Sequence, residues 1–285
     1  MKEMTMNKRP VAFSGTCRLI ISDVDFTFLT DDKQVPPDNL LAIQEAAAKG
    51  IPFAFATGRS WAAIERFASM AHLTVPQVVN NGTALVRPPD GERLCFFPFE
   101  TRLVEFVYGE YLRRGFCPVI YQGNCRMAEW EDEVTQRALT KNDEPFIVVS
   151  KQKIHSVMEE GAEKMAIISY ERAEELAQAT ADISREAASI GLPFDYAFAE
   201  RGIMVLSGRE ATKLKGIKRL CQIQGCSLAD VLTIGDGDND AEMLANTGLG
   251  IAVANGTPMA RDSACRVTTR TNNDAGLAEA IRSVL

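Results

Sequence analysis

The amino-acid sequence predicts an α/β protein in which a doubly wound parallel core sheet carries an inserted α+β domain. At both ends of the chain, short apolar runs of strand length alternate with amphipathic helical segments, as in parallel sheets with right-handed crossovers. From about residue 90 to residue 200 the pattern changes to short strands that follow one another between longer helices. The simplest architecture is therefore one core domain built from both chain ends, with a second domain between them.

Three predicted strands alternate with two predicted helices in the first third of the chain. Each strand is a short apolar run, and each helix follows a start signal, a proline pair for the first and a capping serine for the second. In chain order these elements are a strand at 19–22, a helix from Pro36 to Gly50, a strand at 51–56, a helix from Ser60 and a strand at 76–79.

The turn cluster Arg87-Pro88-Pro89-Asp90-Gly91 separates this region from the middle section. We place the domain boundaries here, which gives a core of residues 1–88 and 200–285 and an inserted domain of residues 89–199. The inserted section predicts helices at 101–114, 131–141 and 171–190, strands at 118–121, 126–129, 146–149 and 165–169, and an antiparallel pair at 194–198 and 203–206.

The final third returns to the alternation of the first. A helix over 213–224 precedes a strand over 231–234, and further strands follow at 250–253 and 265–268. Helices at 239–245 and 277–285 complete the predicted core.

Composition excludes several classes of function. The 285 residues include 46% hydrophobic residues and carry a net charge of −7, whereas a general nucleic-acid binder is usually basic. The seven cysteines form no CxxC pair, and the chain has only two histidines, so a zinc site is not expected. No apolar run is long enough to span a membrane and no signal peptide is recognised, so we expect a cytoplasmic protein. We also expect a monomer or a small homo-oligomer.

Asp23 and Asp25 follow the first predicted strand directly, where ligands bind in parallel α/β sheets. Two carboxylates this close do not both ionise readily without a cation, so we expect Mg²⁺ beside them. A fixed Asp can be the nucleophile of phosphoryl transfer, and a neighbouring acid can protonate the leaving oxygen and later activate water. The alternative is that both residues only cap the following turn.

A second acidic cluster, Gly235 to Asp240, follows the strand at 231–234. An EF-hand is rejected, because Ala241 stands where its loop requires glycine and the segment follows a strand. We expect Asp236 to be a direct metal ligand, while Asn239 and Asp240 begin a helix and orient other groups.

Two further segments can neutralise an anion. Thr57-Gly58-Arg59 ends a strand before a helix, which combines a hydroxyl, a backbone N–H and a helix N-terminus. Lys213 opens a late helix and could neutralise both a phosphate and the Asp23 carboxylate, although Lys215 is a rival for this role.

Taken together, these motifs resemble the haloacid dehalogenase-like superfamily of phosphatases. Asp-x-Asp-x-Thr, Thr-Gly-Arg, a helix-opening lysine and Gly-Asp-x-x-Asn-Asp occur here in the order of that family. The segments Asn239-Asp240-Ala241-Glu242-Met243-Leu244 and Gly250-Ile251-Ala252-Val253-Ala254-Asn255-Gly256 are similar to its Cof-type branch, as is the large insertion after Asn81-Gly82. The resemblance implies a Rossmann-like core with an inserted α/β cap that sets substrate choice.

The resemblance also implies residue roles. Asp23 would be the nucleophile that forms an aspartyl-phosphate, and Asp25 the general acid and base. The metal would be held by Asp23, the backbone carbonyl of Asp25 and Asp236, with Asp240 in support, and the phosphoryl oxygens by Thr57, Gly58, Lys213 and Asn239. The chain departs from the family at Phe26, usually glycine, at Phe28, often leucine, and at Leu214, often glycine.

The expected function is Mg²⁺-dependent hydrolysis of a small phosphorylated metabolite, with a sugar phosphate as the first expectation. One alternative is a phosphomutase or other phosphoryl transferase on the same fold. Another is a non-catalytic binder of a phosphorylated metabolite, suggested by Phe26 in place of glycine. Arg126, Trp130 and His155 are candidate contacts in the inserted domain, but a structural or solvated role is the stronger expectation for each.

Overall fold

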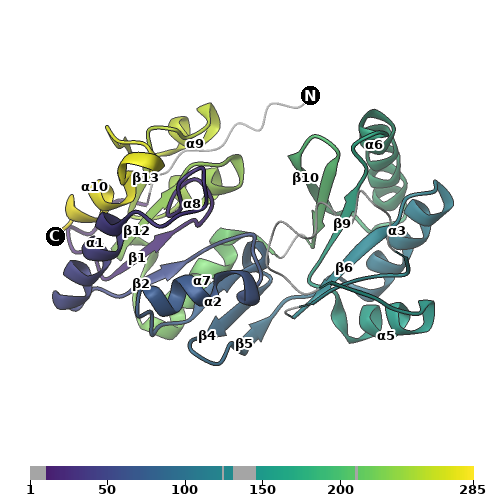
Figure 1. Cartoon of the computed structure of the whole chain (residues 1–285), viewed down its shortest axis with the longest axis horizontal. Helices are drawn as coiled ribbons and strands as arrows, with labels where there is room; N and C mark the ends of the chain where they lie inside the picture. Colours follow the sequence, from purple (N-terminus) through teal and green to yellow (C-terminus); the bar gives the residue numbers. More distant parts are fainter. Residues whose placement is uncertain (1–10, 124, 131–145, 209–210) are drawn as a thin grey trace. The chain divides into compact units, whose positions relative to one another are not determined.

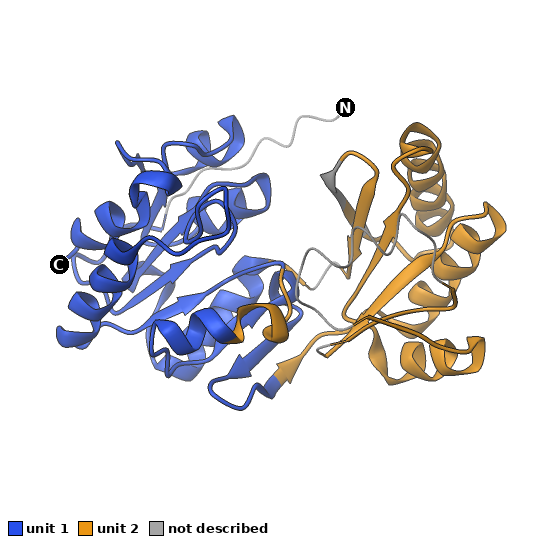
Figure 2. Ribbon diagram, viewed as in Figure 1, with its two compact units in different colours: residues 1–58, 66–94, 213–285 blue, residues 59–65, 95–212 orange. Residues whose placement is uncertain are grey.

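The computed structural model describes residues 11–123, 125–130, 146–208 and 211–285, which form two compact units. Unit 1 comprises Met1–Gly58, Arg66–Leu94 and Lys213–Leu285, and unit 2 comprises Arg59–Glu65 and Cys95–Thr212 (Figure 2). The first and last thirds of the chain therefore share one unit, as the alternation of predicted elements indicates.

The central sheet of unit 1 has five parallel strands in the order β14-β13-β12-β1-β2 (Figure 1). Its strands are β1 (Leu19–Ser22), β2 (Phe53–Phe55), β12 (Val231–Gly235), β13 (Leu249–Ala252) and β14 (Arg266–Val267). All of β1 is buried, and Ile20 lies opposite both Phe53 and Leu232. This arrangement confirms the predicted doubly wound parallel core, and it places the ends of β1 and β12 side by side.

Helices connect these strands. They are α1 (Pro37–Ala48), α2 (Trp61–Met70), α7 (Lys213–Gln224), α8 (Ala241–Ala245), α9 (Pro258–Ser263) and α10 (Gly276–Arg282). The first and last are tied together, because Arg282 forms ion pairs with Asp38 and Glu45 of α1. Among the described residues of both units, no helix combines the length and the apolar character needed to cross a membrane.

A small sheet, β3-β4-β5, accompanies the central one. Its strands are β3 (Gln77–Val79), β4 (Ala84–Arg87) and β5 (Glu92–Phe96). The Arg87-Pro88-Pro89-Asp90-Gly91 cluster is the turn between β4 and β5, closed by the Gly91 N–H donating to the Arg87 carbonyl at 2.9 Å. The compact units divide after Leu94 and after Thr212, whereas the sequence places the boundaries at 88 and 199. A turn cluster signals a change of direction, and here it closes a hairpin.

Unit 2 contains a six-stranded sheet in the order β10-β11-β9-β6-β7-β8. The strands are β6 (Pro118–Gln122), β7 (Cys125–Ala128), β8 (Phe146–Val148), β9 (Lys164–Ile168), β10 (Asp195–Glu200) and β11 (Ile203–Ser207). Three helices, α3 (Thr101–Arg113), α5 (Lys151–Gly161) and α6 (Ala173–Ser189), pack their apolar sides against one sheet face (Figure 1). The sequence did not predict α5, and the predicted helix at 131–141 lies outside the described residues.

Candidate active site

Asp23 stands at the carboxyl end of β1, in the interior of unit 1. Its side chain is buried, and its backbone N–H donates to the carbonyl of Ile234 on the neighbouring strand at 2.9 Å. The hydroxyl of Ser22 donates to the Asp23 carbonyl at 2.6 Å. The position of this carboxylate is thus fixed by the pairing of β1 with β12.

Asp236 stands at the equivalent end of β12, directly after Gly235. The hydroxyl of Thr27, itself fully buried, donates to Asp236 Oδ1 at 2.6 Å. The loop after the first strand therefore reaches across to the acid after the later strand, over 209 positions of sequence. The structure brings the two acidic clusters together, as strand-end placement predicts.

Lys213, the first residue of α7, joins two of the acids. Its ammonium lies 2.8 Å from Asp23 Oδ1 and 2.7 Å from Asp240 Oδ1, with the side chain almost completely buried. Burial alone would lower the pKa of Lys213, but the charges of Asp23 and Asp240 outweigh it, and the net pKa is raised. Of the two rival lysines, Lys213 is the one that enters the acidic cluster, and it does so as a cation.

Asp240 supports the loop of the second acidic cluster from within. It is fully buried, and its Oδ2 accepts from the backbone N–H groups of Asp236 and Gly237, both at 2.9 Å. A Cβ added at Gly235 would lie 2.6 Å from the Asp240 carboxyl carbon, so only glycine fits there. With Oδ1 on Lys213, both oxygens of Asp240 have partners, which suits a residue that holds the loop in place.

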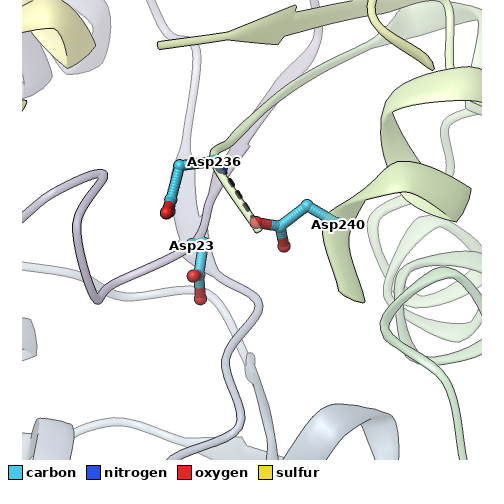
Figure 3. A group of neighbouring side chains, drawn as sticks. All are labelled: Asp23, Asp236 and Asp240. Atoms are coloured by element: carbon cyan, nitrogen blue, oxygen red, sulfur yellow. Dashed lines mark hydrogen bonds between the residues drawn. The ribbon is translucent and has the colours of Figure 1, made fainter. Parts of the chain in front are cut away.

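Three carboxylates converge in this site, and among the described ion pairs Lys213 contacts two of them. Asp23, Asp236 and Asp240 offer oxygens that all lie within 4.8 Å of one another (Figure 3). Burial raises the pKa of Asp23 well above its ordinary value, with Lys213 opposing and the other two acids adding to the rise. Burial likewise raises the pKa of Asp236 to about 7. A hard divalent cation would favour the ionised forms, and carboxylate oxygens of this kind are its preferred ligands, so the residues fit Mg²⁺.

Thr57 and Gly58 lie at the same edge of the sheet. The Ala56 N–H donates to the Ser22 carbonyl at 2.9 Å, which sets the end of β2 beside the end of β1. Thr57 is buried, and its carbonyl accepts from the Asn81 N–H at 2.8 Å. Asn239, by contrast, is exposed, in the turn that precedes α8.

Asp25 is not a member of the group of three converging acids. Its side chain is about a third exposed, and Oδ1 pairs with the ammonium of Lys33 at 2.7 Å. Among the described residues, the group that meets within 4.8 Å contains Asp23, Asp236 and Asp240 but not Asp25. From the sequence we expect the carboxylates of Asp23 and Asp25 to share one small volume. The structure shows the Asp25 carboxylate paired with Lys33.

Phe26, at the position where the resemblance implies glycine, has a left-handed backbone with φ +56°. Such a conformation is unfavourable for a bulky side chain and easy for glycine. Phe26 is 43% exposed, and the Lys33 ammonium lies 4.2 Å from the centroid of its ring. The left-handed backbone that glycine adopts most easily is therefore present at position 26 of this chain, although the residue there is phenylalanine.

Sequence reasoning missed three contributors to this region: Thr27, Lys33 and Asn81. Thr27 belonged to the first motif but received no role, although it binds Asp236. Asn81 follows β3, and its side-chain oxygen would lie 3.1 Å from a Cβ added at Gly58. The Asn-Asn-Gly run after a strand is a sequence signal that could have identified the last of these.

Comparisons with known proteins identify the family of the chain. A family model described as haloacid dehalogenase-like hydrolase matches residues 20–281. An HMP-PP phosphatase of Yersinia enterocolitica is 24% identical over 241 residues, which cover 85% of each chain. A phosphoglycolate phosphatase of Methanopyrus kandleri is 24% identical over 269 residues, covering 94% of this chain and 97% of the relative.

Solved structures show the same fold. A haloacid dehalogenase-like hydrolase from Bacteroides thetaiotaomicron superimposes with a TM-score of 0.81 at 20% identity, covering 95% of this chain and all of the other. A sugar phosphatase of HAD subclass IIB superimposes with a TM-score of 0.77 at 17% identity, covering 93% and 98% of the two chains.

Proposed function

Because the chain belongs to the haloacid dehalogenase-like hydrolases, in their Cof-type branch, we propose that it is a phosphatase that hydrolyses a small phosphorylated metabolite with Mg²⁺. A sugar phosphate is the substrate class we favour, through an aspartyl-phosphate on Asp23. The observation that carries the proposal is the convergence of Asp23, Asp236, Asp240 and Lys213 at one sheet edge, in a chain with phosphatase relatives.

Asp23 is the proposed nucleophile. Lys213 holds its Oδ1 at 2.8 Å, which leaves Oδ2 to attack the phosphorus. The bond from Oδ2 to phosphorus forms as the bond from phosphorus to the leaving oxygen breaks, and Asp25 gives that oxygen a proton. Water then attacks the aspartyl-phosphate, Asp25 takes the proton of the water, and Asp23 and inorganic phosphate are released.

Other residues would stabilise the phosphoryl group during transfer. The Thr57 hydroxyl, the Gly58 N–H and the Asn239 carboxamide are proposed donors to its oxygens, and the Lys213 ammonium neutralises part of their charge. Charge stabilisation and positioning provide most of the catalysis in phosphoryl transfer, so this set suits the reaction.

The residues proposed to hold Mg²⁺ are Asp23, the backbone carbonyl of Asp25 and Asp236, with Asp240 in support. The bound cation would supply Lewis-acid stabilisation of the negative charge on the phosphoryl oxygens. Thr27 and Asp240 would act through their hydrogen bonds, since one holds Asp236 Oδ1 and the other holds the backbone of Asp236.

The test is phosphate release from a panel of hexose and pentose phosphates, with Mg²⁺ and with EDTA. We expect release that depends on Mg²⁺ and turnover of several sugar phosphates. Isomerised sugar phosphate without net release of phosphate would indicate a phosphomutase instead. A rise in melting temperature with a sugar phosphate, but no turnover of any panel member, would indicate a non-catalytic binder.

A further inference from the structure

Lys33, Asp25 and Phe26 form a contact group beside the candidate active site. The Lys33 ammonium lies 2.7 Å from Asp25 Oδ1 and 4.2 Å from the centroid of the Phe26 ring. We propose that Lys33, seated on the ring of Phe26, is a positioning residue that aims the Asp25 carboxyl group for proton transfer. This inference rests on the proposed function, in which Asp25 is the general acid and base.

The backbone at both ends of this group takes a conformation that it would not adopt without support. Phe26 has φ +56° and Lys33 has φ +59°, both in the left-handed region that glycine tolerates best. Non-glycine residues in such conformations occur where the surrounding structure requires them, and they concentrate at functional sites. Here the two residues bring the ring of Phe26 to the Lys33 ammonium, and that ammonium to the Asp25 carboxylate.

A closed turn presents Lys33. The Thr30 N–H donates to the Gln34 carbonyl at 2.9 Å, and the Lys33 N–H donates to the Thr30 carbonyl at 3.0 Å. The Gln34 N–H donates to the Thr30 hydroxyl oxygen, also at 3.0 Å. These bonds fix the point from which the lysine side chain extends.

The other side of the group is anchored to the C-terminal part of unit 1. The Asn255 carboxamide donates to the Phe26 carbonyl at 2.8 Å and accepts from the Asn272 N–H at 2.9 Å. The Asn272 carboxamide in turn donates to the Leu29 carbonyl at 3.0 Å. The backbone of the loop is therefore held in place at Phe26 and Leu29.

The hydrogen bond from Lys33 distinguishes the two oxygens of Asp25. Because the ammonium donates to Oδ1, Oδ2 is the oxygen that carries the proton to the leaving group and later receives one from water. Lys33 exchanges no proton itself. With side-chain exposures of 43% for Lys33 and 31% for Asp25, the pair is weak enough to adjust during turnover. The aromatic ring beneath the ammonium adds a cation–π contact that limits its motion.

Two aryl substrates test this role. Phenyl phosphate has a basic leaving group that needs a proton, whereas p-nitrophenyl phosphate has a similar shape and a leaving group that departs readily without one. We expect Lys33→Met to lower kcat/KM for phenyl phosphate about tenfold, a part of what a general acid contributes. The loss for p-nitrophenyl phosphate should be at least five times smaller. Lys33→Arg should restore most of the activity toward phenyl phosphate.

Two further variants complete the design. Phe26→Leu removes the ring and should reduce kcat/KM for phenyl phosphate about two- to threefold, in the same substrate-dependent way. Lys218→Met, at an exposed position of α7, makes the same change of charge away from Asp25 and should affect neither substrate. Melting temperatures of all variants should match that of the unaltered protein.

Equal losses on both substrates, or a Lys33→Met protein indistinguishable from Lys218→Met, would overturn the positioning role while the phosphatase proposal stands. Failure of Lys33→Arg to restore activity would also overturn the positioning role. Arginine keeps a positive charge at residue 33, so such a result would show that this charge is not what acts on Asp25. If the unaltered protein releases phosphate from neither aryl substrate and from no sugar phosphate of the panel, the proposed function and this inference both fall. Release from panel members but from neither aryl phosphate would overturn this inference alone.

Discussion

The two units bury charged side chains in different ways. In unit 1, Lys213 contacts both Asp23 and Asp240, and Asp236 lies within the same small volume. In unit 2, two of the buried charged side chains have contacts within that unit. Glu163 accepts from the Gly123 N–H at 2.9 Å, and the Lys164 ammonium lies 4.2 Å from the Tyr121 ring centroid.

This difference separates a chemical role from a structural one. A buried charge needs a partner to offset the cost of its desolvation. In unit 1 three acids lie close together, and among the described ion pairs Lys213 contacts two of them, which leaves the third acid without this cation. Such an arrangement persists where a bound cation or a reacting group uses it, and shifted pKa values accompany it. Unit 1 accordingly carries the residues proposed for chemistry, and buried residues of unit 2 provide matched controls.

The largest effect is expected for Lys213→Met. Removing one partner of a buried ionic group typically costs about 3–5 kcal/mol of unfolding free energy. Phosphatase activity should fall by orders of magnitude, because the phosphoryl charge also loses its cation. Lys164→Met is the matched variant, since Lys164 is buried in unit 2. Urea unfolding and phosphate-release assays on both proteins measure the contrast, and an equal loss of activity in the two would contradict it.

The stability of the metal-free protein should depend on pH through Asp236. Its folded-state pKa is raised by burial to about 7 from an ordinary value of 3.8, so the folded protein binds this proton more tightly than the unfolded chain does. The resulting stabilisation is complete below about pH 4 and is lost as the pH rises to about 7, by at most about 4 kcal/mol.

Urea unfolding in EDTA across this pH range, with Asp236→Asn for comparison, measures that contribution. The difference in unfolding free energy between the two proteins should shift in favour of the variant as the pH rises. Saturating Mg²⁺ should remove the pH dependence of the unaltered protein, since a cation favours the ionised form. A difference that stays constant from pH 4 to pH 8 would show that Asp236 does not titrate in this range.

A smaller effect is expected for Thr27→Val, which removes the 2.6 Å hydrogen bond to Asp236 Oδ1. Loss of a group that orients a metal ligand typically weakens metal binding about tenfold or more. Mg²⁺ titrations followed by activity and by melting temperature provide the measurement. Thr180→Val is the counterpart in unit 2, where the hydroxyl is buried beside that of Tyr111 at 2.7 Å. Thr180→Val should lower stability and leave Mg²⁺ affinity unchanged. If Thr27→Val also bound Mg²⁺ with the affinity of the unaltered protein, the result would argue against the assigned site.

The sequence can place several candidate residues of unit 1 near one another because they follow strand ends. Parallel strands deliver their carboxyl ends to one edge, so Asp23, Thr57 and Asp236 can be placed together without coordinates. What the sequence does not reveal is which oxygen each partner takes. Asp240 accepts from two backbone N–H groups, and Asp25 turns to Lys33, and both contacts depend on loop geometry.

Unit 2 is less predictable because it has no chemical motif to mark its elements. Helix α5 was missed, although Ser150 caps it and Ile154, Val157 and Met158 form its buried side. Of the candidate contacts in this unit, Arg126 is buried, whereas Trp130 and His155 are exposed. Isolated polar residues of this kind give no pattern from which a role could be predicted.

The most direct test of the central claim is the identity of the nucleophile. The protein should be mixed with p-nitrophenyl phosphate and Mg²⁺, quenched in acid within the first turnovers, and digested for mass analysis. We predict one phosphoryl group on the peptide that contains Asp23, and neither this adduct nor turnover in a folded Asp23→Asn variant. Continued turnover by that variant, or a phosphoryl group on another residue, would contradict the account.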